Sequence, residues 1–107
     1  MNLFEEYLSS APEEQTDPLL QTAAVRIERI VSTGQVSPPG FWYDQAEDEW
    51  GTVLQGEAGL ETEREILRLK KGDCAFLPAG LRHRVTYTSR EPACIWLCVF
   101  SKAEEKS

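Results

Sequence analysis

The segment GDCAFLPAGLRHRVTY, residues 72–87, decides how the rest of the sequence is interpreted, because it contains the only histidine of the chain, His83. A Pro-Ala-Gly turn separates two strand-like runs, CAFL and HRVTYT, and His83 opens the second run. Upstream, Glu49 starts a Glu-x6-Gly element that ends at Gly56. Two short strands and one tight turn would bring Glu49 and His83 together. A carboxylate beside an imidazole in an apolar scaffold is a candidate metal or substrate site.

Strand-sized segments recur roughly every ten residues between residues 23 and 100. Val25 and Ile27 alternate with polar neighbours, as in a half-buried strand. The run ACIWLCVF, residues 93–100, is apolar throughout and is expected to be buried on both faces. Turn residues punctuate these segments, and none of them offers a crossover helix. The pattern predicts an all-β sandwich or barrel with antiparallel connections.

The two ends of the chain have a different pattern. Residues 2–8 place apolar side chains at helical spacing, which predicts a short amphipathic helix. Residues 9–22 mix prolines with acidic residues and are interpreted as a connecting arm, with one turn beginning at Asp17 and Pro18. Residues 101–107 form a polar tail. We therefore expect an N-terminal helix and arm (1–22), a barrel (23–100) and a tail (101–107).

Length and charge narrow the function classes. At 107 residues the chain is expected to form one domain. A formal net charge of −7 repels phosphate backbones and anionic membrane surfaces, so neither a nucleic acid nor a membrane is an expected partner. The start MNLFEEYLSS lacks the basic and apolar regions of a signal peptide, which predicts a cytoplasmic location.

The three cysteines, Cys74, Cys94 and Cys98, are an odd number without the paired spacing of a zinc ribbon. Cys94 and Cys98 would lie about 13 Å apart along one strand, too far for a disulfide. We expect all three to be small buried hydrophobic residues in a reducing compartment.

The residues around His83 resemble the second motif of the cupin family, G-x5-P-x-G-x2-H-x3-N. Gly72, Pro78, Gly80 and His83 match it, and Tyr87 stands in place of the asparagine. The resemblance covers about residues 23–100 and is to small single-domain cupins. It implies a double-sheet jelly-roll barrel with one open mouth and with the motif glutamate and histidine pointing inward.

The first cupin motif, G-x5-H-x-H-x3/4-E-x6-G, is matched only by Glu49 and Gly56, so it is degenerate. Under the two spacings of that motif, its histidine positions hold either Tyr43 and Gln45 or Trp42 and Asp44. Strand alternation alone leaves the direction of Glu49 open, because the opposite side of its strand is at least as apolar. The resemblance, rather than the alternation, directs Glu49 inward.

A metal site would use His83 and Glu49, with Gln45, Asp44 or both and with water completing the shell. One imidazole cannot build a two-histidine-one-carboxylate iron site, so the expected ion is a loosely held divalent cation such as zinc or manganese. The alternative is a hydrogen-bonded Glu49–His83 pair in a barrel that holds no metal.

Aromatic residues supply candidate ligand contacts. Trp42 and Tyr43 precede the presumed first-motif strand and would ring the barrel mouth, and Tyr87 would offer its hydroxyl to the same cavity. Core packing is the alternative for all three. Arg82 and Arg84 flank His83 and are expected to face solvent.

The leading functional hypothesis is a small-molecule-binding barrel that holds a weakly bound divalent metal or none. The alternative is an enzyme of the isomerase or hydrolase type, in which His83 and Glu49 act as an acid–base pair or hold a metal-bound water. A structural or regulatory adaptor is a third class. The resemblance also implies a homodimer formed by sheet packing.

Overall fold

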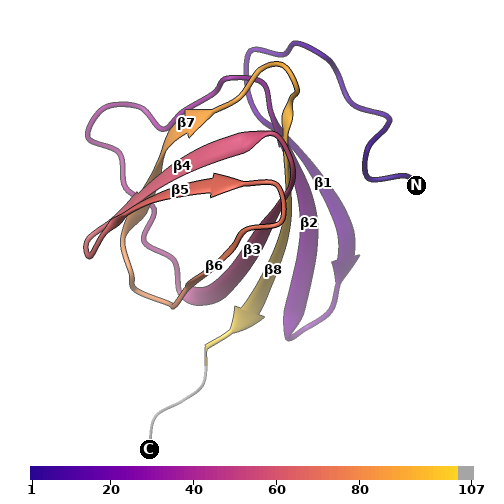
Figure 1. The fold of residues 1–107 in the computed structure, drawn as a ribbon. Helices are drawn as coiled ribbons and strands as arrows, with labels where there is room; N and C mark the ends of the chain where they lie inside the picture. Colours follow the sequence, from indigo (N-terminus) through magenta and orange to yellow (C-terminus); the bar gives the residue numbers. More distant parts are fainter. Residues whose placement is uncertain (104–107) are drawn as a thin grey trace, which may run out of the picture.

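Two antiparallel sheets packed face to face form the molecule, as the computed structural model of residues 1–103 shows (Figure 1). The described residues contain eight strands and no helix: β1 (Gln15–Gln21), β2 (Val25–Ser32), β3 (Glu47–Gln55), β4 (Glu57–Thr62), β5 (Ile66–Lys70), β6 (Cys74–Leu77), β7 (His83–Thr88) and β8 (Cys94–Lys102). One sheet has the order β1-β2-β8-β3-β6 and the other β5-β4-β7. All neighbouring strands run antiparallel. The prediction of an all-β jelly-roll barrel is confirmed.

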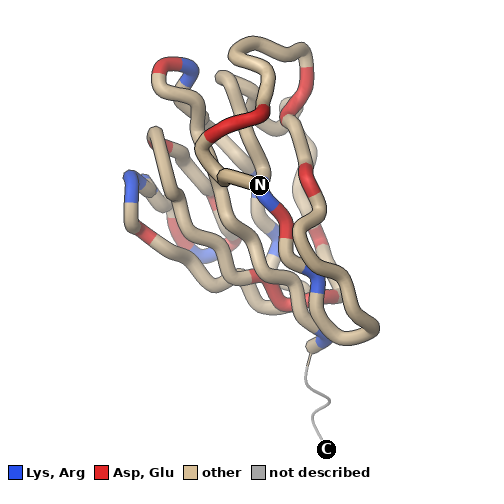
Figure 2. Tube along the Cα trace, turned by 90° about the vertical axis from the view of Figure 1, so that its right-hand side faces the viewer, with Lys and Arg blue, Asp and Glu red and all other residues tan. Residues whose placement is uncertain are grey.

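Acidic residues outnumber basic ones along the chain, and both kinds are distributed over strands and loops (Figure 2). Within the described residues, no helix has the length and apolar character needed to cross a membrane. Residues 1–22 contain five acidic residues and no Lys or Arg, so most of the net charge of −7 lies in this N-terminal part of the chain.

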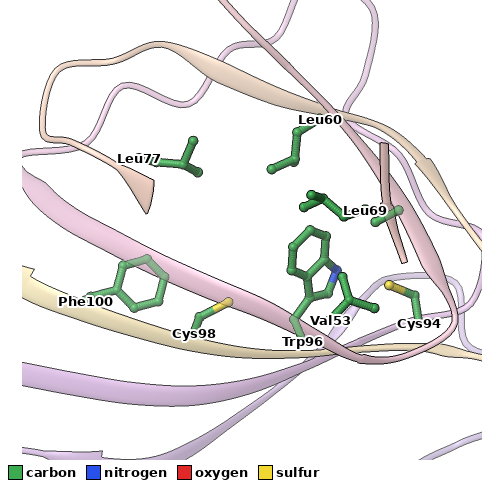
Figure 3. Packing of buried hydrophobic residues seen from close by; sticks show 9 residues of the cluster. Val53, Leu60, Leu69, Leu77, Cys94, Trp96, Cys98 and Phe100 are labelled. Atoms are coloured by element: carbon green, nitrogen blue, oxygen red, sulfur yellow. The ribbon is translucent and has the colours of Figure 1, made fainter. Parts of the chain in front are cut away.

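Strand β8 is the centre of the larger sheet, because its apolar run pairs with β2 on one side and β3 on the other. Its side chains alternate between two hydrophobic clusters. Trp96, Cys98 and Phe100 point into the barrel, where they meet side chains of β3, β4, β5 and β6 (Figure 3). Ile95, on the other face, packs with Val31 beneath the N-terminal segment. This two-sided burial explains the absence of polar residues from the run.

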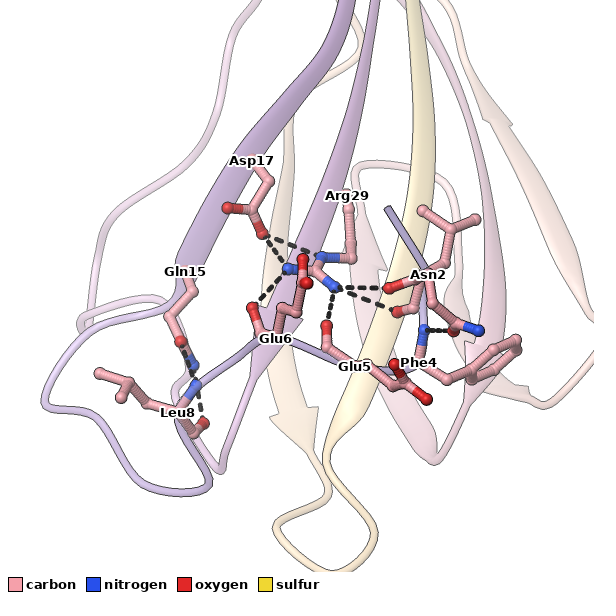
Figure 4. Close-up of polar contacts among 9 residues, drawn as sticks. Asn2, Phe4, Glu5, Glu6, Leu8, Gln15, Asp17 and Arg29 are labelled. Atoms are coloured by element: carbon pink, nitrogen blue, oxygen red, sulfur yellow. Dashed lines mark hydrogen bonds and ion pairs between the residues drawn. The ribbon is translucent and has the colours of Figure 1, made fainter.

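The predicted helix over residues 2–8 is wrong, and a buried arginine provides the physical reason. Arg29 is fully buried, and its guanidinium donates hydrogen bonds to the backbone carbonyls of residues 2, 3, 5 and 6 and to the Asp17 carboxylate (Figure 4). Carbonyls that accept these bonds are directed toward Arg29 and not along a helix axis. An isolated helix of this length would also be marginal in water. The segment instead covers the outer face of the larger sheet.

The predicted connecting arm, residues 9–22, contains strand β1, so the expected turn at Asp17 and Pro18 is also wrong. β1 pairs with β2 at the edge of the larger sheet, and the register shifts between Pro18 and Leu20. Proline is tolerated in an edge strand or at a bulge, because its missing N–H is not needed by a second neighbour. The prolines of this segment therefore led to a wrong prediction of a loop where the structure has a strand.

The cysteines are all free thiols, but they are not all buried. Cys94 and Cys98 are buried as expected, whereas Cys74 is exposed. β6 is an edge strand whose Ala75 and Leu77 point into the barrel, so Cys74 and Phe76 lie on the opposite face.

Candidate functional site

A cavity of about 230 Å³ lies between the two sheets and is partly open to solvent. Its apolar wall comes from both sheets and includes Ile30, Leu60, Leu77, Trp96 and Phe100. The polar groups gather on β2, β3, the start of β7 and the segment before β3. Five side chains of the cavity lining also belong to the hydrophobic core cluster shown in Figure 3: Leu60, Leu77, Trp96, Cys98 and Phe100. The cavity is therefore bordered by the packed core on its apolar side.

Glu49 and His83 meet in this cavity. Glu49 lies on β3, between Leu77 of β6 and Phe100 of β8. His83 starts β7 opposite Thr62, and its ring faces across the barrel interior toward the carboxylate. The His83 Nε2 and Glu49 Oε1 atoms are 3.7 Å apart, which is too long for a direct hydrogen bond. The two groups therefore border the same space, and neither uses its hydrogen-bonding capacity on the other.

The surroundings of His83 hold the imidazole neutral and fix its orientation. The side chain is only 7% exposed, and this burial lowers the pKa of His83. Its Nδ1 lies 3.3 Å from the Leu81 carbonyl, so we assign the ring proton to Nδ1. The ring also stacks on Tyr43, with centroids 5.2 Å apart, and the two residues exchange backbone hydrogen bonds. The lone pair of Nε2 is left facing the cavity.

The Glu49 carboxyl is a weaker acid than an ordinary glutamate. Burial raises its pKa from 4.5 to about 7, against the opposing effect of a hydrogen bond with the Cys98 thiol. Glu28 and Glu14 raise it further by charge repulsion, while Arg26 lowers it. Near neutral pH the carboxyl is therefore protonated in part of the molecules and can either donate or accept a hydrogen bond.

The segment before β3 places alternate residues inside and outside the cavity. Tyr43 and Gln45 line it, as expected for residues at the two histidine positions of the shorter-spaced motif. Asp44 and Trp42 do not line it. Trp42 instead lies against the guanidinium groups of Arg82 and Arg84, 5.3 and 5.9 Å from its ring centre. Of the residues predicted to contact a ligand or metal, Trp42 and Asp44 are thus outside the cavity.

Tyr87 is also outside the cavity, because β7 contains a bulge. Gly59 of β4 pairs with Tyr87 and Leu60 pairs with Val85, so Thr86 has no partner and the alternation reverses there. Val85 lines the cavity as expected. Tyr87 is 42% exposed and lies beside Arg68 on the outer surface. The prediction that its hydroxyl enters the cavity assumed an unbroken strand.

Three charged residues of the cavity were missed from the sequence. Arg26 and Glu28 line it from β2, and Glu14 stands at its rim just before β1, where the residue is exposed. Arg26 Nη1 and Nε each lie 3.0 Å from a carboxylate oxygen, of Glu47 and Glu28 respectively. Its guanidinium also lies 4.2 Å from the centre of the Phe100 ring. The alternation of β2 was the available signal, since it puts Arg26 and Glu28 on one face of the strand.

The side chains of this cavity supply few ligands for a metal ion. Among residues 1–103, no group of three or more His, Cys, Asp or Glu side chains is arranged to hold one. Of the four predicted ligands, His83, Glu49 and Gln45 reach the cavity and Asp44 does not. Burial also raises the pKa of the Cys98 thiol well above its ordinary value.

Comparisons with known proteins agree with this architecture. A family model described as the cupin domain matches residues 29–100. A Ralstonia eutropha JMP134 protein described as a "putative mannose-6-phosphate isomerase" is 44% identical, with 96% of this chain and 97% of that chain covered and a TM-score of 0.93. KdgF from Halomonas sp. is 22% identical, with coverage of 97% and 94% and a TM-score of 0.75.

A conserved Streptococcus pyogenes protein of unknown function, SPY1581, is 23% identical, with coverage of 98% and 88% and a TM-score of 0.78. At a sequence identity of 22% or 23%, the similarity to the last two proteins shows a shared fold only. No curated protein matches the chain. The family model covers most of the barrel, and the 44% identity extends over nearly the whole chain. The protein therefore belongs to the cupin family.

Proposed function

We propose that this cupin binds a small polar molecule in the cavity between Glu49 and His83. The observation that carries the proposal is the 3.7 Å separation of two buried polar groups that border the same open space. Buried polar groups are normally hydrogen-bonded, so an unused imidazole nitrogen favours an additional partner. A volume of about 230 Å³ is below the ~300–1,000 Å³ typical of drug-sized ligands, which favours a small molecule.

The chemistry of the two groups favours a ligand with a hydroxyl or amine. His83 Nε2 would accept a hydrogen bond, and Glu49 would donate or accept one according to its protonation state. Leu60, Leu77 and Trp96 would pack against the carbon atoms of the same molecule. This combination of an apolar wall and few convergent polar groups is typical of small-molecule sites.

Thermal unfolding in the presence of a library of small polyols, amines and hydroxy acids tests the proposal. We expect at least one compound to raise the unfolding temperature of the parent protein, since a ligand that binds only the folded state stabilises it. His83→Gln and Glu49→Gln should each remove the shift. Tyr87→Phe, on the outer surface, is the control and should keep it. Equal shifts in all four proteins would refute binding at this site.

An acid–base isomerase is a second candidate, favoured by the Glu49 pKa of about 7 beside a neutral imidazole. A group with a pKa near the working pH is suited to accept and return a proton. In an aldose–ketose isomerisation, the Glu49 carboxylate would take the proton from the carbon next to the carbonyl and return it to the former carbonyl carbon. His83 Nε2 would take the proton of the adjacent hydroxyl and pass it to the former carbonyl oxygen. The description of the Ralstonia protein as an isomerase is compatible with this chemistry.

Deuterium incorporation into sugars, measured in deuterated water, distinguishes an isomerase from a protein that only binds the sugar. An isomerase should incorporate deuterium at the carbon next to the carbonyl, and Glu49→Gln should abolish the incorporation. A ligand that stabilises the parent protein but never exchanges leaves binding as the function.

A divalent metal such as zinc or manganese is the weakest of the proposed occupants. His83 and Glu49 would supply one nitrogen and one oxygen, and the Gln45 amide oxygen is a weaker ligand. Two strong protein ligands favour loose and exchangeable binding. Metal analysis of protein purified without chelator, compared with the Glu49→Ala and His83→Ala variants, measures the occupancy directly.

A further inference from the structure

We propose that the cavity is selective for charge: it takes a small ligand bearing a protonated amine and excludes anionic ligands. The proposal rests on the proposed binding function and names the chemical class of its ligand. It is carried by residues outside both cupin motifs, namely Glu14, Arg26 and Glu28, together with the position of Glu49.

Carboxylates exceed cationic groups in the cavity. Glu28 and Glu49 lie in its wall, with side chains that are 16% and 14% exposed, and Glu14 stands at its rim. Arg26 is the cationic residue of the lining. Its Nη1 donates a hydrogen bond to the Glu47 carboxylate at 3.0 Å, and its Nε lies 3.0 Å from a Glu28 carboxylate oxygen but forms no hydrogen bond among residues 1–103. Glu14 and Glu49 form no ion pair with Arg or Lys among residues 1–103. An amine that enters the cavity therefore gains uncompensated carboxylates.

The carboxylates of the cavity also raise the pKa values of the acidic groups beside them. Glu14 is exposed to solvent on one side, yet partial desolvation at the rim of the cavity raises the pKa of its carboxyl, and the Glu28 carboxylate raises it further. Burial also raises the pKa of Tyr43, with additional contributions from Glu14 and Glu49. Like charges that disfavour one another's ionised forms become more stable when a cation is placed between them.

The remaining lining suits an N–H donor. The His83 side chain is more than nine-tenths buried, and within the described residues its Nε2 atom has no hydrogen-bond partner. As an acceptor, Nε2 can receive a proton of an ammonium group. The rings of Tyr43 and Trp96 line the same space, and aromatic faces attract cations.

An anionic ligand in the cavity would be repelled by these carboxylates. The Arg26 guanidinium would have to exchange its carboxylate partners for the ligand, and the ligand would remain close to Glu28 and Glu49. Repulsion between like charges is strong at short distance inside a protein. Sugar phosphates should therefore bind worse than uncharged sugars, and amino sugars better.

The single histidine makes the test direct, because its ring resonances need no assignment among several histidines. Methylammonium, formate and inorganic phosphate are titrated in turn into the folded protein at constant ionic strength, on the alkaline side of neutrality. We expect methylammonium to shift the His83 ring resonances saturably and the two anions to produce no saturable shift. A saturable shift with either anion, or none with methylammonium, overturns the proposal.

A pair of double variants separates the local field from net charge. Glu14→Gln combined with Glu28→Gln should weaken methylammonium binding on the order of tenfold. Glu65→Gln combined with Glu91→Gln changes the net charge equally at exposed sites outside the cavity and should leave the affinity unchanged. Equal weakening in both pairs would contradict a local charge filter.

Ligand binding and charge selection can be tested separately. If the compound library yields a His83-dependent ligand that is anionic, binding stands and charge selection falls. If no compound of any charge shifts the His83 resonances or the unfolding temperature, the proposed function falls as well.

Discussion

Arg26 and Arg29 lie on the same strand, β2, and face opposite sides of the larger sheet. Arg29 is closed off beneath the N-terminal segment, with hydrogen bonds to one carboxylate and four backbone carbonyls. Arg26 borders the cavity, is 30% exposed and has two carboxylate partners. The outer face of β2 thus ties the N-terminal segment to the sheet, whereas the inner face borders the cavity with a partly exposed ion-pair cluster. Stability and binding should therefore depend on different faces of the strand.

The largest effect should come from Arg29→Met. This change removes a buried cation and strands the carboxylate and carbonyls that it ordered, so we expect a loss of about 3–5 kcal/mol in the free energy of unfolding. Arg26→Met, at a partly exposed site, should cost about 1 kcal/mol or less. Urea unfolding of both variants measures the difference. Similar losses in the two would show that the faces are not distinct in stability.

The next effect concerns the pH dependence of stability. Because the pKa of Glu49 is about 7 in the folded protein and 4.5 ordinarily, the folded state binds the proton more tightly between these values. Stability should therefore fall as the pH rises from about 4.5 to 7. Removing the ionisable group in Glu49→Gln should raise the free energy of unfolding at pH 8 by up to about 3 kcal/mol.

His83 opposes this trend, since its lowered pKa means that stability is lost as the pH falls below its ordinary value of 6.5. The difference between parent and Glu49→Gln isolates the Glu49 contribution. Urea unfolding at several pH values measures it. A difference that does not vary with pH would contradict a buried, weakly acidic Glu49.

A smaller effect on stability, with a large effect on binding, is expected for Gly51→Ala. Gly51 lines the cavity, and an added methyl group would meet Cys98 Sγ at 3.5 Å and Trp96 at 3.7 Å, which is ordinary contact. The free energy of unfolding should change by less than about 1 kcal/mol. Ligand-induced thermal shifts should shrink, because the methyl group occupies cavity space. Unchanged shifts would place the ligand elsewhere.

The smallest effect is expected from added metal. Zinc or manganese should raise the unfolding temperature of the parent protein little more than that of His83→Ala, since the cavity offers too few strong ligands. A large increase that requires both His83 and Glu49 would show a metal site after all.

The sequence predicted the fold well, because strand rhythm and turn residues are local signals. It also identified Glu49 and His83, whose family spacing is preserved. It missed β1, since Pro18 conceals an edge strand, and it predicted a helix where Arg29 instead binds the backbone carbonyls. These features depend on partners distant in sequence, which local propensity does not report.

Errors at the site have a similar origin. One unpaired residue, Thr86, moves Tyr87 to the outer surface, and periodicity cannot reveal such a bulge. Arg26 and Glu28 were overlooked because the polar face of a strand is usually assumed to face solvent. In a barrel with an open cavity, polar residues can face the interior, and only the packing of both sheets decides this.

The central claim is that the carboxyl of Glu49 and the imidazole of His83 share one buried cavity, and NMR titration of the single histidine tests it most directly. The account predicts that the His83 ring resonances titrate below the ordinary pKa of 6.5 and also record a second step at about pH 7, which disappears in Glu49→Gln. An ordinary histidine titration that is identical in the parent protein and in Glu49→Gln would contradict it.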